Sequence, residues 1–422
     1  MRAALHYAKE EIQFEVPDEK LAWVIDRKAS PPLQNPRESL RGALKAPIKS
    51  PPLEKIAERV SRVLILVDDI TRQTPQDIII PVLLNELNDA GVSDQEIELM
   101  IALGTHRKMT EIEIENKLGK AVTQRVSVHN FDCHNRQDLV KIGTMLTGAD
   151  ILVSRKVVSA DLVIGVGNIV PHCYAGWAGG GKIIMPGVCG TATIGATHIA
   201  AGMIRPISSI IGTLENPIRK MIDEIALKAG LRFVVNTILN QDDEISGVFA
   251  GHPIEAFRTG VEHAKETYCP TIDALADIVV ASSYPADLDY WQAAKPADHA
   301  CLGIKEGGTL ILVAPCPEGV SRVHPELKTF GRLTYDEVLD KHRRKEIRDR
   351  VAVAALLLHS QMREHVEVAC LSHGLTREDK EALGFSHAAS VQEAVDQAVS
   401  KMGEEARIGV MKCGDIMPVL TR

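Results

Sequence analysis

The sequence has few aromatic residues: Phe, Trp and Tyr together make up 4% of its 422 residues. Surfaces that stack nucleic-acid bases depend on aromatic side chains. The net charge is −8, and no long run of basic residues occurs. An acidic protein without basic runs does not attract polyanions. We therefore expect neither a nucleic acid nor an anionic membrane as its main partner.

Long apolar runs and paired cysteines are also missing. No segment approaches the roughly 18 apolar residues of a membrane-spanning helix, and the N-terminal segment has no signal-peptide core. The eight cysteines are scattered, without a Cys-x-x-Cys pair, so we expect neither a disulfide framework nor a thiolate zinc site. A His-Glu-x-x-His motif is absent as well. These absences predict a cytoplasmic enzyme with reduced cysteines.

Short apolar runs alternate with helical patterns along the whole chain. In the first part, the apolar runs cover residues 62–67, 97–103, 126–131 and 162–166, and a hairpin follows at 233–239 and 245–250. In the second part, they cover residues 276–282, 309–314, 366–371 and 407–411. Strand, polar loop, helix and strand in this order are typical of parallel sheets. The sequence thus predicts an α/β protein of two α/β domains with mostly parallel sheets, at 1–270 and, smaller, at 271–422.

The ends of the chain carry separate predictions. Residues 1–30 predict a short strand pair. The proline-rich residues 31–53 predict an extended connector around a helix near 37–44, with a disordered linker as the alternative. The last strand, 407–411, has two possible places, because it could also pack against the first domain.

Polar motifs follow three of the expected strands. They are DDITRQTP (68–75), GTHR (104–107) and the glycine-rich stretch that begins after Val166. The carboxyl ends of parallel strands meet at one edge of a sheet, where open α/β folds bind ligands. We therefore expect these motifs to bring six side chains together: Asp69, Arg72, His106, His172, Lys182 and His198.

The first motif suits an anion. Asp69 and Arg72 precede an expected helix, whose N-terminus offers amides and partial positive charge, and Arg72 adds a bidentate donor. Thr74 and Pro75 suit the N-cap and first position of that helix. The alternative is an ordinary helix cap with a surface ion pair.

The glycine-rich stretch offers one special cation. Lys182 follows Gly179–Gly181, so backbone can approach a ligand there closely. The lysine could bind phosphate, form a covalent link to a cofactor, or simply be solvated. Ile183 stands where a Walker A motif needs Ser or Thr, and Val170 breaks a dinucleotide fingerprint. Nucleotide hydrolysis and NAD binding are therefore poorly supported.

The histidines have both chemical and structural interpretations. His106 and His172 could act as acid–base groups or be hydrogen-bonded structural residues. His198 could be a metal ligand or a core residue. Gln292 and Lys295 lie at helical spacing, which alone indicates a solvated helix face. The residues by themselves thus indicate an α/β enzyme with histidine acid–base groups, an anion clamp and one special lysine.

The chain carries five motifs in a fixed order: DDITRQTP (68–75), GTHR (104–107), PHCYAGWAGGGK (171–182), ATHIA (196–200) and YWQAAKPA (290–297). Their order and spacing, over nearly the whole chain, resemble the nickel-dependent lactate racemase family. The resemblance implies a nickel-pincer nucleotide (a pyridinium-3,5-bisthiocarboxylic acid mononucleotide that binds nickel) attached covalently to Lys182. It implies His198 as the protein ligand of nickel, and His106 and His172 as the two general bases.

The resemblance also implies an active site in the cleft between the two domains. Asp69, Thr71 and Thr74 should then contribute to cofactor binding. The substrate should contact Arg72 from the first domain and three residues of the second: Trp291, Gln292 and Lys295. A tyrosine is expected where Trp291 stands, so the substrate could be lactate or a larger or more polar 2-hydroxy acid.

The implied reaction is racemisation or epimerisation of a 2-hydroxy acid by reversible hydride transfer. Acid–base groups typically contribute about 10²–10⁴-fold, too little to break the C–H bond of the substrate unaided. Implied partners are cofactor maturation proteins and, in a homodimer, a second copy of the chain. Two alternatives stay open: a lysine Schiff-base enzyme with a pyridoxal-like cofactor, and a non-catalytic metal- or nucleotide-binding protein.

Overall fold

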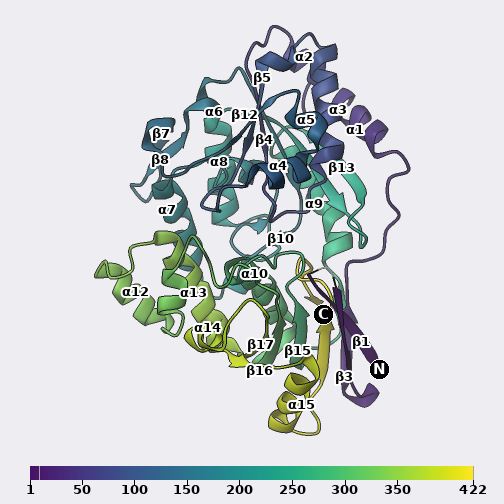
Figure 1. Ribbon diagram of the computed structural model, residues 1–422, viewed down its shortest axis with the longest axis vertical. Helices are drawn as coiled ribbons and strands as arrows, with labels where there is room; N and C mark the ends of the chain where they lie inside the picture. Colours follow the sequence, from purple (N-terminus) through teal and green to yellow (C-terminus); the bar gives the residue numbers. More distant parts are fainter. Residues whose placement is uncertain (9, 422) are drawn as a thin grey trace.

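The computed structural model describes residues 1–8 and 10–421 and contains two six-stranded sheets, one above the other in Figure 1. The upper sheet has the order β13-β12-β9-β4-β5-β6 and is parallel except for its edge strand β13. Its strands are β4 (Val63–Val67), β5 (Ile97–Ile101), β6 (Ser127–Asn130), β9 (Leu162–Asn168), β12 (Leu231–Leu239) and β13 (Ile245–Gly251). Every residue of β4 and β9 is buried, as expected for central strands covered on both faces.

Helices cover both faces of this sheet. One face packs against α1 (Pro36–Lys45), α2 (Leu53–Ala57) and α3 (Gln76–Asp89), and the other packs against α8 (Pro217–Ala229) and α9 (Glu255–Tyr268). Smaller elements lie around the sheet: α4 (Glu111–Leu118), α5 (Lys120–Thr123), α6 (Arg155–Ser159), α7 (Thr191–Gly202) and the hairpin of β7 (Leu139–Thr144) and β8 (Asp150–Ser154). The predicted connector helix and the predicted hairpin near residue 240 are confirmed as α1 and β12–β13.

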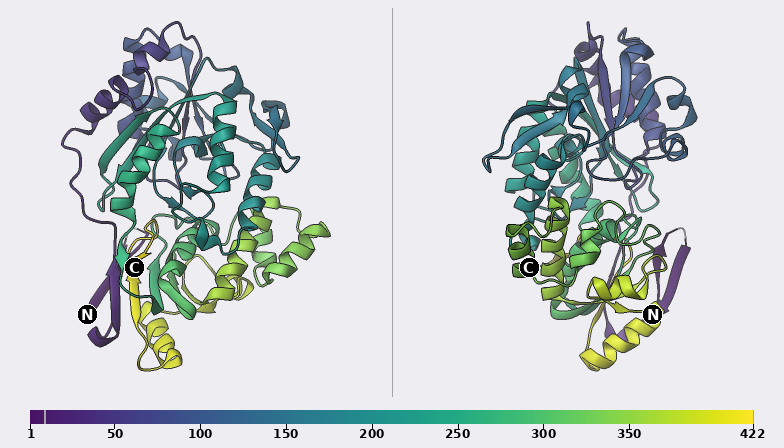
Figure 2. Two further views of the ribbon diagram at one scale, coloured as in Figure 1. Left: turned by 180° about the vertical axis from the view of Figure 1, so that it is seen from behind. Right: turned by 60° about the vertical axis from the view of Figure 1, so that its left-hand side comes forward.

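The lower sheet is wholly parallel, with the order β18-β17-β16-β15-β19-β3. Its strands are β3 (Leu21–Ile25), β15 (Ala276–Ser282), β16 (Ile304–Val313), β17 (Glu367–Leu371), β18 (Ser386–His387) and β19 (Ile408–Met411). Its helices are α10 (Tyr290–Ala300), α11 (Glu326–Phe330), α12 (Tyr335–Arg343), α13 (Arg350–His365), α14 (Arg377–Ala382) and α15 (Val391–Met402). Figure 2 shows the two lobes from two further sides. The predicted α/β class with mostly parallel sheets is confirmed.

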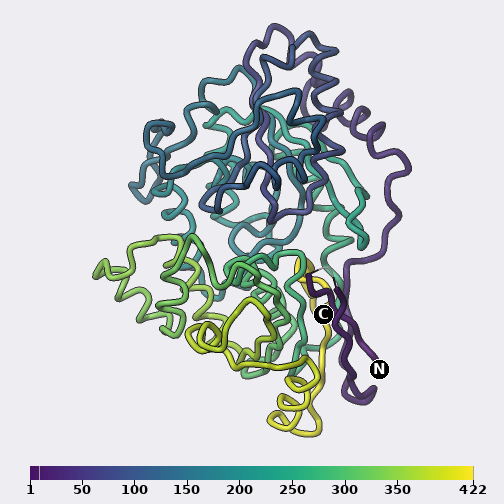
Figure 3. Tube along the Cα trace, in the orientation of Figure 1, coloured from purple at the N-terminus to yellow at the C-terminus, as the bar shows by residue number. Residues whose placement is uncertain are grey.

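The N-terminal strands belong to the lower lobe. The predicted strand pair is present as β1 (Arg2–Tyr7) and β2 (Glu10–Glu15), and the next strand, β3, pairs with β19 in the lower sheet. The last strand, β19, lies in the lower sheet between β15 of the second part and β3, whose residues fall within the predicted first domain of 1–270. The chain thus crosses between the lobes after β3 and again near Cys269, as the tube in Figure 3 shows. None of the helices in the described residues has the length and apolarity to cross a membrane.

The start of α3 differs from the sequence prediction. The helix begins at Gln76, its N-cap is Pro75, and no side chain caps it. Thr74 instead donates its hydroxyl proton to Asp68 Oδ2 at 2.5 Å. The cap prediction is wrong because the neighbouring carboxylate binds the hydroxyl that would otherwise accept from the helix amides.

Arg27 joins the lobes where the chain first crosses. Its guanidinium donates to both carboxylate oxygens of Asp415 in the lower lobe, at 3.0 and 2.8 Å. It also donates to Asp243 Oδ1 at 2.6 Å and to the carbonyl oxygen of Asn240 at 2.9 Å, both in the β12–β13 turn. Only 5% of Arg27 is exposed. This residue therefore fixes the crossing with a buried network of charged hydrogen bonds.

We expect Arg27→Ala to lower the free energy of unfolding by about 3–5 kcal/mol, because it leaves Asp415 buried without its partner. Urea unfolding followed by circular dichroism measures this change. Arg62→Ala is the matched control: it removes an exposed ion pair with Asp161 and should change nothing measurable. If Arg27→Ala and Arg62→Ala were equally stable, Arg27 would not stabilise the point where the chain crosses between the lobes.

Candidate active site

A cavity of about 90 Å³ lies between the carboxyl ends of the two sheets. The loops after β4, β5 and β9 supply the upper wall, and α10 supplies the lower wall. Nine of the residues singled out in the sequence line it: Asp69, Thr71, Arg72, His106, His172, Lys182, His198, Trp291 and Lys295. Two others do not: Gln292 contacts His106 from the side, and Thr74 is buried against Asp68. The expected convergence of the strand-end loops is therefore present.

His106 is oriented by a hydrogen-bonded chain that also contains Asp69, Gln292 and Lys295. Asp69 Oδ2 lies 2.5 Å from His106 Nδ1, and Gln292 Nε2 lies 3.3 Å from His106 Nε2. Lys295 donates to the amide oxygen of Gln292, which turns the amide nitrogen towards the imidazole. Because the carboxylate accepts at Nδ1, the proton of the neutral ring resides there, and the lone pair of Nε2 accepts from Gln292. The network thus presents His106 Nε2 as a base.

The charges of this chain are set by burial and by neighbours. Burial lowers the pKa of His106, and the positive charges of Lys295 and Arg72 lower it further, against the opposing effect of Asp69. Burial alone would raise the pKa of Asp69, but its contacts with His106, Arg72 and Thr71 outweigh this and hold it well below the ordinary value. The pair therefore consists of an ionised Asp69 and a neutral His106 near pH 7.

His172 has the opposite orientation. Its Nδ1 accepts backbone N–H groups of Tyr174 and Ala175 at 3.1 and 3.4 Å, so the proton of the neutral ring resides on Nε2. Burial and the nearby cations Lys182 and Lys295 hold the pKa of His172 well below its usual value. Of these two imidazoles, His106 therefore has its lone pair on Nε2, where it accepts from Gln292, and His172 has an N–H on Nε2.

Lys182 is held by a tight glycine turn. A Cβ on Gly180, where φ is +57°, would lie 2.7 Å from the ring of Phe257, so only glycine fits. The Gly180 amide donates to Asn236 Oδ1 at 3.1 Å. Burial and the charges of Arg72 and Lys295 hold the pKa of Lys182 well below its ordinary value. The charged form of this amine is therefore disfavoured relative to that of an exposed lysine, which favours its use as a nucleophile.

His198 lies on α7 and faces the same cavity. Its Nδ1–H donates to the carbonyl oxygen of Ile194 at 2.9 Å, which leaves the lone pair of Nε2 free. Burial first, and then the charge of Lys182, lowers the pKa of His198 to about 3. A neutral imidazole with its second nitrogen anchored to a carbonyl is the form that binds a metal ion.

The comparison with known proteins decides the family. Residues 7–210 match the lactate racemase N-terminal domain, and residues 272–417 match the lactate racemase C-terminal domain. A lactate racemase from Thermoanaerobacterium thermosaccharolyticum is 32% identical over 319 residues, 74% of each chain. The chain belongs to the lactate racemase family. It is accordingly an isomerase of the racemase type.

Further relatives of this family member cover almost all of the chain. A lactate racemase from Lactiplantibacillus plantarum is 28% identical over 421 residues, 97% of each chain. The structure of the lactate racemase apoprotein from Thermoanaerobacterium thermosaccharolyticum covers 99% of this chain and 100% of its own, with 26% identity and a TM-score of 0.88. A protein from Thermotoga maritima shares the fold at 21% identity, with a TM-score of 0.75 over 93% of this chain and 100% of that one.

In this lactate racemase family member, His198 is a possible single metal ligand at the cavity. Within residues 1–8 and 10–421, no group of three or more His, Cys, Asp or Glu side chains could hold a metal ion. His198 offers one free imidazole nitrogen in the cavity that Lys182 also lines. One imidazole and one nucleophilic amine fit a metal-bearing organic group that is attached covalently to the lysine.

Three cavity residues with polar side chains were not among the predicted site residues. Thr105 lies in the GTHR loop beside His106, and Asp68 precedes Asp69 at the end of β4. Tyr174 packs against His198 with 5.1 Å between ring centroids. Trp177, in the same glycine-rich segment, does not reach the site: it is fully buried and donates to the carbonyl oxygen of Gly212 at 2.8 Å.

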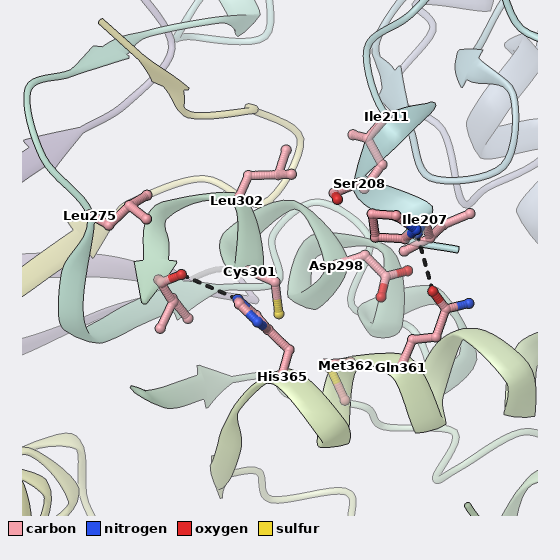
Figure 4. A pocket seen from close by; sticks show the side chains of 12 residues that line it. Ile207, Ser208, Ile211, Leu275, Asp298, Cys301, Leu302, Gln361, Met362 and His365 are labelled. Carbon is pink, nitrogen blue, oxygen red and sulfur yellow. Dashed lines mark hydrogen bonds between the residues drawn. The ribbon is translucent and has the colours of Figure 1, made fainter. Parts of the chain in front are cut away.

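A second cavity, of about 310 Å³, adjoins the end of α10 and is shown in Figure 4. Two of its polar side chains are already bonded: His365 donates to the carbonyl oxygen of Ile304 at 3.2 Å, and Gln361 accepts from the amide of Ile207 at 3.1 Å. Burial raises the pKa of Asp298 to about 7, and the thiol of Cys173 bonds to its carboxyl. None of the predicted site residues lines this cavity. The chemistry belongs to the smaller cavity between the sheets.

Proposed function

We propose that this chain racemises a 2-hydroxy acid, with lactate as the first candidate, by hydride transfer with a nickel-pincer nucleotide bound to Lys182. The observation that carries the proposal is the cavity itself. It combines the Lys182 amine, whose pKa is held below its ordinary value, the free lone pair of His198, two further imidazoles, Arg72 and Lys295. The two lactate racemases that resemble the chain support lactate as the substrate class.

Each part of the cofactor has a residue to bind it in this proposal. The Lys182 amine would form the covalent bond, and His198 would bind nickel through Nε2. Asp69 and Thr71 line the same cavity, whereas Thr74 would act indirectly by holding Asp68. When bound, the cofactor supplies a hydride acceptor, which acid–base residues alone cannot replace. Nickel tolerates such a mixture of soft and imidazole ligands.

The remaining residues would bind the substrate and move its proton. Arg72 and Lys295 supply positive charge for the carboxylate. The substrate hydroxyl replaces the Gln292 amide at His106 Nε2, which accepts the hydroxyl proton while Asp69 stabilises the imidazolium. Trp291 closes the lower wall and excludes water. His172 presents its Nε2–H to the substrate oxygen in the other orientation. It would act as a base there in the other tautomer, in which the proton resides on Nδ1 and the ring no longer accepts from the Tyr174 and Ala175 amides.

Loading and location are part of the same proposal. We infer that dedicated maturation proteins supply the cofactor, and that the chain works in the cytoplasm. The eight cysteines of the chain are free, which agrees with a reducing compartment.

The test is a racemisation assay with protein from cells that also produce the maturation proteins. Each pure enantiomer of lactate, and of larger 2-hydroxy acids, is converted and analysed by chiral chromatography. We expect conversion of both enantiomers to the same mixture, with a dependence on nickel. A chromophore that bleaches with hydroxylamine and does not depend on nickel would instead support the Schiff-base enzyme. A loaded protein that converts none of the acids would support the non-catalytic alternative.

The dependence of kcat/KM on pH should reflect the titration of Lys295. Burial and the charge of Arg72 lower the pKa of Lys295 to about 7. The ammonium that attracts the substrate carboxylate is present below this pKa and is lost above it, so kcat/KM should fall about tenfold per pH unit on the alkaline side. Lys295→Arg keeps the charge and should move this fall to higher pH. An unchanged alkaline limb in Lys295→Arg would contradict the assignment.

A further inference from the structure

A row of three polar side chains crosses the cleft beside the cavity. Asp349 Oδ2 lies 2.5 Å from His324 Nδ1, and His324 Nε2 lies 3.0 Å from Thr105 Oγ1. Thr105 belongs to the upper lobe, in the loop after β5. His324 and Asp349 belong to the lower lobe, in the loop before α11 and at the N-cap of α13. The row therefore joins the two lobes at the active site.

The bonding pattern fixes the role of each group. Asp349 accepts at Nδ1, so the neutral ring of His324 has its lone pair on Nε2, and the hydroxyl of Thr105 donates to it. Both ring nitrogens are thus engaged, and 4% of His324 is exposed. A base must reach the substrate, and His324, unlike His106 and His172, does not line the cavity. His324 is consequently not a third acid–base residue.

The same imidazole supports the wall of the cavity. The ring of His324 packs edge-on against Trp291, with 4.3 Å between centroids and 74° between planes. The indole of Trp291 also meets His106, with 5.0 Å between centroids and 83° between planes. Trp291 therefore contacts both imidazoles, and a shift of His324 would be passed through the indole to His106.

The loop that carries Thr105 contacts the lower lobe through three consecutive side chains. Thr105 bonds to His324, His106 bonds to Gln292, and Arg107 donates to both carboxylate oxygens of Glu318 at 2.9 and 3.0 Å. Of the three partners in the lower lobe, His324 is the one whose ring packs on the ring of Trp291. A change in the distance between the lobes at the Thr105–His324 contact would therefore change the position of Trp291 in the cavity wall.

We infer that His324 is a positioning residue: through Thr105 and Asp349 it holds the two lobes together at the cleft and keeps Trp291 against His106. Asp349 fixes the ring from below, since its other oxygen caps α13 by accepting from the amides of Val351 and Ala352 at 2.9 and 3.2 Å. The effect on turnover rests on the proposed function. The contact between the lobes through Thr105, His324 and Asp349 is a property of the chain without cofactor.

The first measurement is hydrogen–deuterium exchange of the cofactor-free protein. Thr105→Val removes the hydroxyl and keeps the shape, and His324→Asn keeps a group near Asp349 but cannot reach Thr105. We expect amide exchange in residues 102–110 and 288–294 to become several-fold faster in both variants. Thr105→Ser, which keeps the hydroxyl, should exchange like the wild type. Thr259→Val, an exposed threonine on α9, is the matched control. Unchanged amide exchange in Thr105→Val and His324→Asn would contradict the inference that the Thr105–His324 contact holds the two lobes together.

The second measurement is turnover of the loaded enzyme. A displacement of about 1 Å at a reacting group can cost about 100-fold, so kcat of Thr105→Val should fall by about 10- to 100-fold, and Thr105→Ser should restore it. The double variant Thr105→Val/His324→Asn should be no slower than the slower single variant, because both remove one contact. Faster exchange with an unchanged kcat, or additive losses, would overturn the positioning role. An inactive wild type would overturn the proposed function alone, since the exchange experiment does not need turnover.

Discussion

Replacement of Lys182 by methionine is expected to abolish racemisation and to leave the fold of the cofactor-free protein intact. Methionine has a similar length, so it fills the same space beside Gly181. The amine that it removes has a pKa held well below the ordinary value by burial and by the surrounding cations. Removing such a group relieves repulsion and costs no ion pair, so stability should not fall.

The loss of activity follows from the chemistry. The histidines can contribute about 10²–10⁴-fold as acid–base groups, which does not suffice to break the substrate C–H bond. Activity of Lys182→Met should therefore lie at the background of a chiral chromatography assay. Lys380→Met is the control, since Lys380 is also a buried lysine but bonds to Ser372 within the lower lobe. Turnover by Lys182→Met would show that the lysine only binds an anion.

Replacement of His106 by glutamine should lower kcat by about 10²–10⁴-fold, the usual contribution of a general base. Glutamine can still meet Gln292 but cannot accept a proton. Asp69→Asn should have a related effect, because an amide at this position no longer fixes the proton of His106 on Nδ1. His106→Gln should still carry the cofactor on Lys182.

The two directions of the reaction should respond differently. In the structure His106 presents a lone pair and His172 an N–H. His106→Gln should therefore slow the enantiomer whose hydroxyl faces His106 more than the other, and His172→Gln should do the reverse. Initial rates from each pure enantiomer measure this difference. Equal losses in both directions, or a loss below about tenfold, would contradict separate roles for the two imidazoles.

The sequence allowed most of the upper half of the site to be predicted. Asp69, His106 and His172 follow apolar strands, and parallel topology alone places such loops at one edge. Lys182 could be singled out because three glycines precede it. These inferences need only local pattern and the period of strands and helices, which depend on neighbouring residues in the chain.

The lower half of the site was less accessible to sequence reasoning. His324 contacts Thr105 across more than two hundred positions, and neither residue lies in a pattern that signals a partner. The one available signal was the place of His324 in a polar loop after β16, again at the carboxyl end of a strand. The pairing of β3 with β19 was hidden for the same reason: it depends on how the whole chain folds back. The prediction that Thr74 caps α3 was wrong because the Thr74 hydroxyl donates to Asp68 instead.

The central claim is that Lys182 carries a nickel-bearing nucleotide. The most direct test is the intact mass of the protein, together with its nickel content, after production with the maturation proteins. We predict one added mass of mononucleotide size and about one nickel per chain, both absent in Lys182→Met, with nickel lost and the mass retained in His198→Ala. An unmodified wild type without nickel, under conditions that load a known lactate racemase, would contradict the account and leave Lys182 as a simple anion ligand.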